Sequence, residues 1–147
     1  MPPRVLGLDF GVRRIGVAVS DELGLTAQPV LTLLRKNAKQ DLKSLGRLVR
    51  KFGCSAIVLG HPLHLSGDIS PLAIKTQAFA ESLREAFSLP VHLWDERLSS
   101  AEAHRHLHAA GRALPGHREV VDQVAAMLIL QSFLDAQRGA QASYNQE

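Results

Sequence analysis

The sequence predicts an α/β fold in which helices cover both faces of one mixed sheet. Two short apolar runs, Arg4–Asp9 and Ile15–Val19, follow each other so closely that only a turn fits between them. Further along, short apolar runs alternate with segments whose leucines recur at helical spacing. A hairpin followed by alternating helices and strands is typical of a sheet with both antiparallel and parallel neighbours.

The first half of the chain is expected to form three strands and a helix. Gly11 lies near the bend of the hairpin, where a tight turn can require a positive φ. A third strand is predicted over Pro29–Leu34, with the proline at its start, where a missing N–H donor does least harm. Apolar residues then recur at helical spacing from Leu42 to Phe52, and Gly53 suits the end of that helix.

Two more buried strands are expected in the middle of the chain. Ala56–Gly60 is fully apolar and too short for a helix, and Val91–Glu96 is a short run that ends in acidic residues. Between them, Pro71 lies near the first turn of another predicted helix.

The last third is predicted to be helical. Ser99–Glu102 resembles a capping box that opens one helix, and the stretch from Gly111 to Gly116 breaks it. A final helix is predicted from about Arg118 to Gln137. We therefore expect a single domain over residues 1–138, followed by a polar C-terminal tail over 139–147.

Composition narrows the class of protein. The chain has 147 residues, of which 46% are hydrophobic and 21% charged, as is typical of a globular domain. The longest apolar runs are too short to span a bilayer and no charged-then-apolar leader is present, so we expect a cytoplasmic protein that does not contact membranes. A single cysteine excludes an internal disulfide, and a net charge of +3 permits a polyanionic partner without requiring one.

Three acidic residues occupy positions that suggest a common site. Asp9 closes the first strand, Glu96 closes the last, and Asp122 lies on the apolar stripe of the final helix. The carboxyl ends of parallel strands gather at one edge of a sheet, which is where ligands bind. Three converging carboxylates repel one another unless a cation or a proton neutralises them.

Magnesium, or manganese in its place, is the natural cation for such a cluster because hard ions prefer oxygen ligands and can also hold phosphate. Two such ions can activate water and stabilise the leaving oxygen of a phosphodiester. Each acid also has a structural alternative: a turn residue at Asp9, an ion pair with Arg97 at Glu96, and a favourable helix N-terminus at Asp122.

The residues around these acids form four motifs, and together they resemble the YqgF family, also called RuvX. The similarity runs from about Arg4 to Leu134 with the motifs in family order. They are Gly7-Leu-Asp-Phe-Gly11 with Arg14-Ile-Gly-Val-Ala18, Gly60-His-Pro-Leu63 with Gly67, Asp95-Glu-Arg-Leu-Ser-Ser100, and Val121-Asp-Gln-Val-Ala-Ala126 with Ile129-Leu-Gln.

This resemblance implies an RNase H-like fold with a five-stranded mixed sheet and helices on both faces. It also implies metal-dependent phosphodiester cleavage, with Asp9, Glu96 and Asp122 as the catalytic and metal-binding residues. The family's proposed role is trimming the 5′ end of the precursor of 16S ribosomal RNA, which implies this RNA and the ribosome as partners. Its other described role is resolution of four-way DNA junctions.

Arginines near the acids are candidates for binding nucleic acid, because guanidinium groups match phosphate geometry. Arg13, Arg14 and Arg97 either contact phosphates or pair with the acids. Arg105 and Arg112 lie on one side of a predicted helix, and Arg118 remains from a lysine-rich segment that the family commonly has before its last acid. Gly7, Gly11 and Gly16 are small enough to let phosphate approach the backbone.

Three functions remain open at this point. A nuclease acting on structured RNA, as a monomer or weak homodimer, is favoured. A junction resolvase shares the chemistry but needs a symmetric dimer to make paired nicks. A non-catalytic module that binds nucleic acid or the ribosome would retain the acids without binding metal.

Overall fold

The protein is described by a computed structural model that covers residues 4–64, 66–109 and 117–145, with side chains described except at 108–109 and 141–145. Its five strands form one sheet in the order β3-β2-β1-β4-β5. The first three strands are antiparallel neighbours, whereas β1, β4 and β5 run parallel, so the predicted mixed sheet is confirmed. The strands are β1 (Arg4–Phe10), β2 (Arg14–Ser20), β3 (Ala27–Leu34), β4 (Cys54–His61) and β5 (Val91–Asp95).

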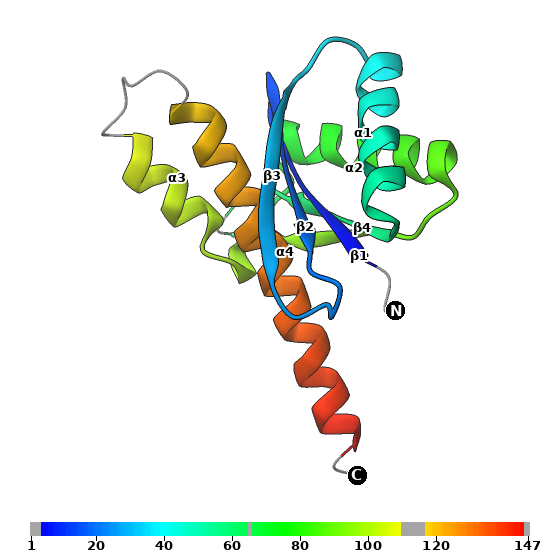
Figure 1. The fold of residues 1–147 in the computed structure, drawn as a ribbon. Coiled ribbons are helices and arrows are strands. Elements are labelled where there is room, and N and C mark those ends of the chain that lie inside the picture. Colours follow the sequence, from blue (N-terminus) through cyan, green and yellow to red (C-terminus); the bar gives the residue numbers. More distant parts are fainter. Residues whose placement is uncertain (1–3, 65, 110–116, 146–147) are drawn as a thin grey trace.

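Helices cover both faces of this sheet, as predicted (Figure 1). On one face lie α1 (Ala38–Phe52) and α2 (Pro71–Phe87), and on the other lie α3 (Ala101–Ala109) and α4 (His117–Asn145). A single 3₁₀ turn, η1 (Glu96–Leu98), connects β5 to α3. The helices and strands thus alternate in the order that the periodicity of the sequence predicts.

The side chains of β1 point alternately to the two faces of the sheet. Leu6, Leu8 and Phe10 are buried in the core beneath α1 and α2. Gly7 and Asp9 therefore face α4, because successive side chains of a strand point to opposite faces. A second apolar cluster, which includes Ala126 and Ile129 of α4, packs on this other face. Asp9 is thus a polar residue, near the end of β1, on the face of the sheet that packs mainly apolar side chains against α4.

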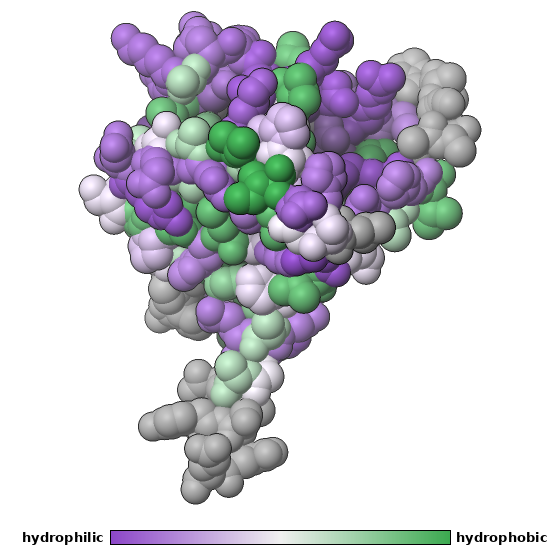
Figure 2. Space-filling view, turned by 180° about the vertical axis from the view of Figure 1, so that it is seen from behind, coloured by the Kyte–Doolittle hydropathy of each residue, from purple (hydrophilic) through white to green (hydrophobic). Residues whose placement is uncertain are grey.

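The final helix is longer than the sequence predicts. We expect an end near Gln137 and a polar tail from residue 139, whereas α4 continues to Asn145. Gly139 disfavours a helix interior by only about 1 kcal/mol relative to alanine, and its alanine and glutamine neighbours are good helix formers. The side chains of residues 135–140 are exposed, and this end of α4 projects beyond the sheet (Figures 1 and 2).

The edge strand β3 also differs in detail from its predicted form. It begins at Ala27, so Pro29 is its third residue rather than its first. Pro29 pairs with Ala18 beside a register shift that leaves Val30 of β3 without a partner in β2, and irregularities of this kind let an edge strand accommodate a residue without an N–H group.

Among the described residues, no helix combines the length and the apolar character needed to cross a bilayer. On the face seen in Figure 2, hydrophilic residues dominate, and hydrophobic ones lie in small separate groups, one of them near the centre.

Candidate active site

Asp9 and Glu96 meet at the edge of the sheet where β1, β4 and β5 end. Both residues are buried, with only 8% and 5% of their surface exposed. Gly60 of β4 lies between them, and a Cβ atom on it would come within 2.8 Å of Glu96 Oε1. The missing side chain of Gly60 therefore leaves the space that the Glu96 carboxylate occupies.

Asp122 reaches the same edge because α4 lies directly on a glycine of β2. Gly16 is the antiparallel partner of Asp9. A Cβ atom on Gly16 would lie 2.0 Å from the carbonyl oxygen of Asp122, well inside van der Waals contact. Gly7 receives α4 in the same way, against Leu130. We expected phosphate to approach the backbone at Gly7 and Gly16, and in the structure it is helix α4 that lies close to both. Gly11 does not have the positive φ that a tight hairpin turn can require.

Two arginines neutralise the three carboxylates. The Arg105 guanidinium donates to Glu96 Oε2 at 2.9 Å and its other nitrogen lies 3.8 Å from Asp9 Oδ2. Arg14 Nε donates to Asp122 Oδ2 at 2.6 Å. The acids are therefore divided into a buried pair that shares one arginine and a third carboxylate held by another.

The environment of Asp9 favours its protonated form. Burial raises the pKa of Asp9 to about 7; Arg105 opposes this, and the nearby carboxylates of Glu96 and Asp122 add to it. A hydrogen bond between the carboxyl groups of Asp9 and Glu96 acts in the same direction. A proton on Asp9 would lessen the repulsion between its carboxyl group and the neighbouring carboxylates.

This raised pKa makes stability depend on pH. Between pH 4 and pH 7 the folded protein holds a proton on Asp9 that the unfolded chain has lost, so the free energy of unfolding contributed by this residue falls as pH rises. Each unit of raised pKa corresponds to about 1.4 kcal/mol. We expect Asp9→Asn to gain stability relative to wild type across this range.

Urea unfolding of both proteins in chelator, at a series of pH values, measures this difference. The difference should stop growing above pH 7, where Asp9 is ionised in both states. Parallel stability curves for the two proteins would contradict the raised pKa.

The other candidate arginines occupy different surroundings. Arg97 binds Asp95 at 2.6 Å rather than Glu96, and this contact lowers the pKa of Asp95. Arg13 and Arg118 are exposed near the site elements. Arg112 lies outside the described residues. A role in binding nucleic acid remains a prediction for all the candidate arginines.

A hollow opens beside the acid pair. It has a volume of about 390 Å³, and Glu96 and Arg105 form part of its wall. The loop after β4 provides Pro62, Leu63 and His64 on another side. Of the three acids, Glu96 is the one that lines this hollow, together with its partner Arg105.

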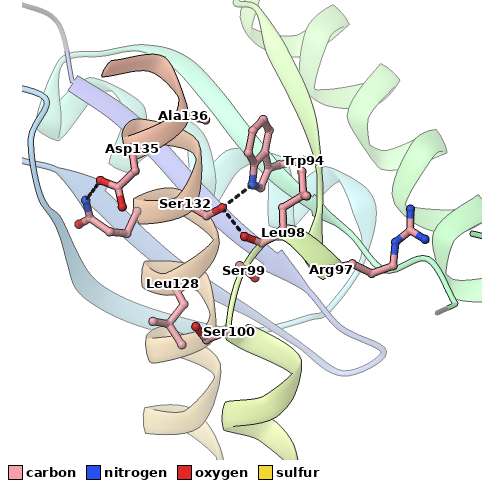
Figure 3. Close-up of a pocket in the computed structure, with 10 residues that line it drawn as sticks. Trp94, Arg97, Leu98, Ser99, Ser100, Leu128, Ser132, Asp135 and Ala136 are labelled. Atoms are coloured by element: carbon pink, nitrogen blue, oxygen red, sulfur yellow. Dashed lines mark hydrogen bonds between the residues drawn. The ribbon is translucent and has the colours of Figure 1, made fainter. Parts of the chain in front are cut away.

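A hydrogen-bond relay fixes the Glu96 turn to α4. The Trp94 indole N–H donates to Ser132 Oγ at 2.9 Å, and the Ser132 hydroxyl donates to the Leu98 carbonyl at 2.9 Å (Figure 3). The Trp94 ring also packs edge-on against Phe133. These contacts hold β5, η1 and α4 in register, and the sequence reveals Ser132 only as a polar residue on an otherwise apolar helix face.

The acids do not form a ready-made metal cage. Within residues 4–64, 66–109 and 117–145, no three His, Cys, Asp or Glu side chains are arranged so that they could hold a metal ion. Asp9 and Glu96 are in contact, whereas Asp122 is engaged by Arg14.

Solved structures with the same arrangement of strands and helices establish the class of fold. Thermus thermophilus RuvC in complex with Holliday junction substrate superposes with a TM-score of 0.57 at 15% identity, over 93% of this chain and 96% of that one. The Fowlpox virus resolvase bound to Holliday junction DNA gives 0.54 at 11% identity, over 91% and 98%. The chain therefore has an RNase H-like fold.

Sequence comparison is more specific. The family model RuvX, described as Holliday junction resolvase, matches residues 3–136, and the chain belongs to this family. A relative in Koribacter versatilis is 49% identical over 132 residues, covering 90% of this chain and 86% of its own. A second, in Geobacillus kaustophilus, is 48% identical over 137 residues, covering 92% and 99%. Both are named "Putative pre-16S rRNA nuclease". Family and relatives together support a nuclease function.

Proposed function

We propose that this protein is a divalent-metal-dependent nuclease of the cytoplasm that processes the 5′ end of pre-16S ribosomal RNA. The observation that carries the proposal is the buried contact between Asp9 and Glu96, with Asp122 beside it, at the carboxyl edge of an RNase H-like sheet. The names of the relatives support the RNA substrate.

Magnesium or manganese would be held by Asp9 and Glu96, with Asp122 joining them when it separates from Arg14. The donor set fits a hard cation, because all three side chains offer carboxylate oxygens. The present contacts fit a cation too, since the Arg105 guanidinium already places a positive charge beside Asp9 and Glu96. Such an ion, when bound, would activate water and stabilise the leaving oxygen of the phosphodiester.

The arginines would hold the substrate while the acids act on it. Arg105 lines the hollow and now binds Glu96. Its guanidinium group could instead bind a backbone phosphate, with two parallel N–H···O hydrogen bonds. Arg14, which now binds Asp122, could likewise bind a phosphate instead. We propose that the exposed Arg13 and Arg118 also bind phosphates of the substrate. Arg97 and Arg112 would bind nucleic acid at the periphery of the site.

Removing Arg105 should strengthen metal binding. The guanidinium and a divalent cation compete for the same two buried carboxylates, so Arg105→Gln removes the competitor. We expect about a tenfold tighter Kd for Mn²⁺ at a pH above 7, measured by calorimetry, which corresponds to about 1.4 kcal/mol. Arg97→Gln is the matched control, because its partner is Asp95. Equal or weaker binding by Arg105→Gln would refute the competition.

A cleavage assay with two substrates tests the function. The purified protein is incubated with a 16S rRNA precursor carrying its 5′ extension and, separately, with a four-way DNA junction, with and without Mg²⁺. We expect metal-dependent shortening of the RNA and little cleavage of the junction. Paired nicks in the junction by a dimer would favour a resolvase instead. Binding of both substrates without cleavage in either metal would favour a non-catalytic module.

A further inference from the structure

The outer side of α1 carries a dense positive charge. Its only acidic residue, Asp41, is buried and accepts the backbone N–H of Lys36 at 3.0 Å. The protein's net charge is only +3, so this concentration on one helix is not a reflection of overall composition. The exposed basic residues, which we call the α1 basic stripe, are Lys36, Lys39, Lys43, Arg47, Arg50 and Lys51.

The spacing of this stripe is regular and its position is fixed. Lys39, Lys43 and Arg47 recur every four residues, which places them on one side of the helix about 6 Å apart. This separation is comparable to that between neighbouring phosphates along a nucleic acid strand. Asn37 caps the start of the helix and Gly53 ends it in a left-handed conformation, so the stripe has defined ends.

The stripe is available for a partner. None of its six side chains forms an ion pair with an acid in the described part of the chain. Lys36, Lys43 and Arg47 also line a groove of about 450 Å³ between β3 and α1. Unpaired basic side chains around a groove suit a polyanion that runs along it.

The stripe begins at the edge of the sheet that holds the acids. Arg14 pairs with Leu34 at the ends of β2 and β3, so β3 ends at the same edge as β1. Arg35 then donates to the carbonyls of Gly11 and Val12, just beyond Asp9 in the chain. α1 covers the face of the sheet opposite to the acids, so an RNA strand that leaves the acid pair would pass over this end of the sheet to reach the stripe.

We propose that the α1 basic stripe binds the backbone phosphates of RNA flanking the cleavage site, as a second contact surface apart from the active site. This inference rests on the proposed function for its substrate. A lipid surface fits less well, because Leu45 and Leu48 of α1 are buried in the core and leave no apolar face for insertion.

Paired variants test this surface by binding, independently of cleavage. Lys43→Gln/Arg47→Gln removes two charges from the stripe, and Lys75→Gln/Arg138→Gln removes two exposed charges elsewhere. Each is titrated without metal against two fragments of the 16S rRNA precursor, both containing the cleavage site, one with short and one with extended flanks. Cleavage of the short fragment with Mg²⁺ is measured separately.

We expect the stripe variant to bind the extended RNA about tenfold more weakly at about 0.15 M salt, with the salt slope reduced by about 1.5 to 2. Its binding and cleavage of the short RNA should match wild type, and the control variant should match wild type throughout. Equal losses in both variants, or equal losses on both fragments, would overturn the proposal. So would unchanged RNA binding together with lost binding to phosphatidylserine vesicles.

If neither protein cleaves the precursor but the stripe variant still discriminates between the fragments, the proposed function fails and the surface stands.

Discussion

Replacing Asp9 by asparagine is expected to reduce cleavage at least about 10²-fold while nucleic acid binding persists or tightens. The side chain keeps its size, so the packing of β1 against α4 is preserved. What is lost is the carboxylate at the point where Glu96, Arg105 and Asp122 converge. Removing a negative charge also lessens repulsion of the phosphate backbone, which is why binding should not suffer.

Asp95→Asn is the matched control. Asp95 is next to Glu96 but pairs with Arg97, and its side chain accepts the Arg97 backbone N–H, a contact that asparagine can also make. Cleavage rates of the RNA precursor and binding affinities are measured for both variants with Mg²⁺. Wild-type cleavage by Asp9→Asn would remove this carboxylate from the mechanism, and inactivity of both variants would point to damage of the surrounding turn.

A methyl group at position 16 is expected to impair both folding and cleavage. In Gly16→Ala the new Cβ atom would lie 2.0 Å from the Asp122 carbonyl oxygen, which belongs to the backbone of α4 and cannot turn aside. The helix must shift away from β2 and carry Asp122 with it. Overpacking of this kind typically destabilises by about 1–3 kcal/mol, and the displaced acid should lower cleavage further.

Gly139→Ala, in the helix α4 that Gly16 contacts, provides the comparison. A Cβ atom there meets nothing within 4 Å, and alanine is the better helix former, so a gain of up to about 1 kcal/mol is expected. Urea unfolding and cleavage assays separate the two variants. Wild-type stability and activity in Gly16→Ala would mean that α4 does not need the space at Gly16.

Much of the fold is encoded in local patterns of the sequence. The helix over Leu42–Phe52 and its end at Gly53 follow from apolar spacing and from a residue that tolerates positive φ. The strands followed from short apolar runs. The end of α4 did not, because a single glycine followed by helix-favouring residues gives no clear stop signal.

The site could be predicted in part. Sequence reasoning selected Asp9, Glu96 and Asp122, and the structure brings the first two into contact. The sequence alone left open whether Arg14 pairs with an acid or with phosphate, because its partner Asp122 lies in a helix more than a hundred residues further along the chain. Gly60 was part of one of the sequence motifs, but its role could not be predicted. The lack of a side chain at Gly60 makes room for the Glu96 carboxylate only because β1, β4 and β5 lie side by side in the sheet.

The pairing of Arg105 and Arg14 with the three acids has a consequence for how the protein matures. Many metalloproteins are unfolded until the ion arrives, because only the ion can reconcile their ligands. Here Arg14 and Arg105 supply counter-charges to the acids, so we expect the chain to complete its tertiary structure without a bound ion. The proposed metal ion would then replace these contacts in a protein that is already folded, and its supply would control activity rather than folding.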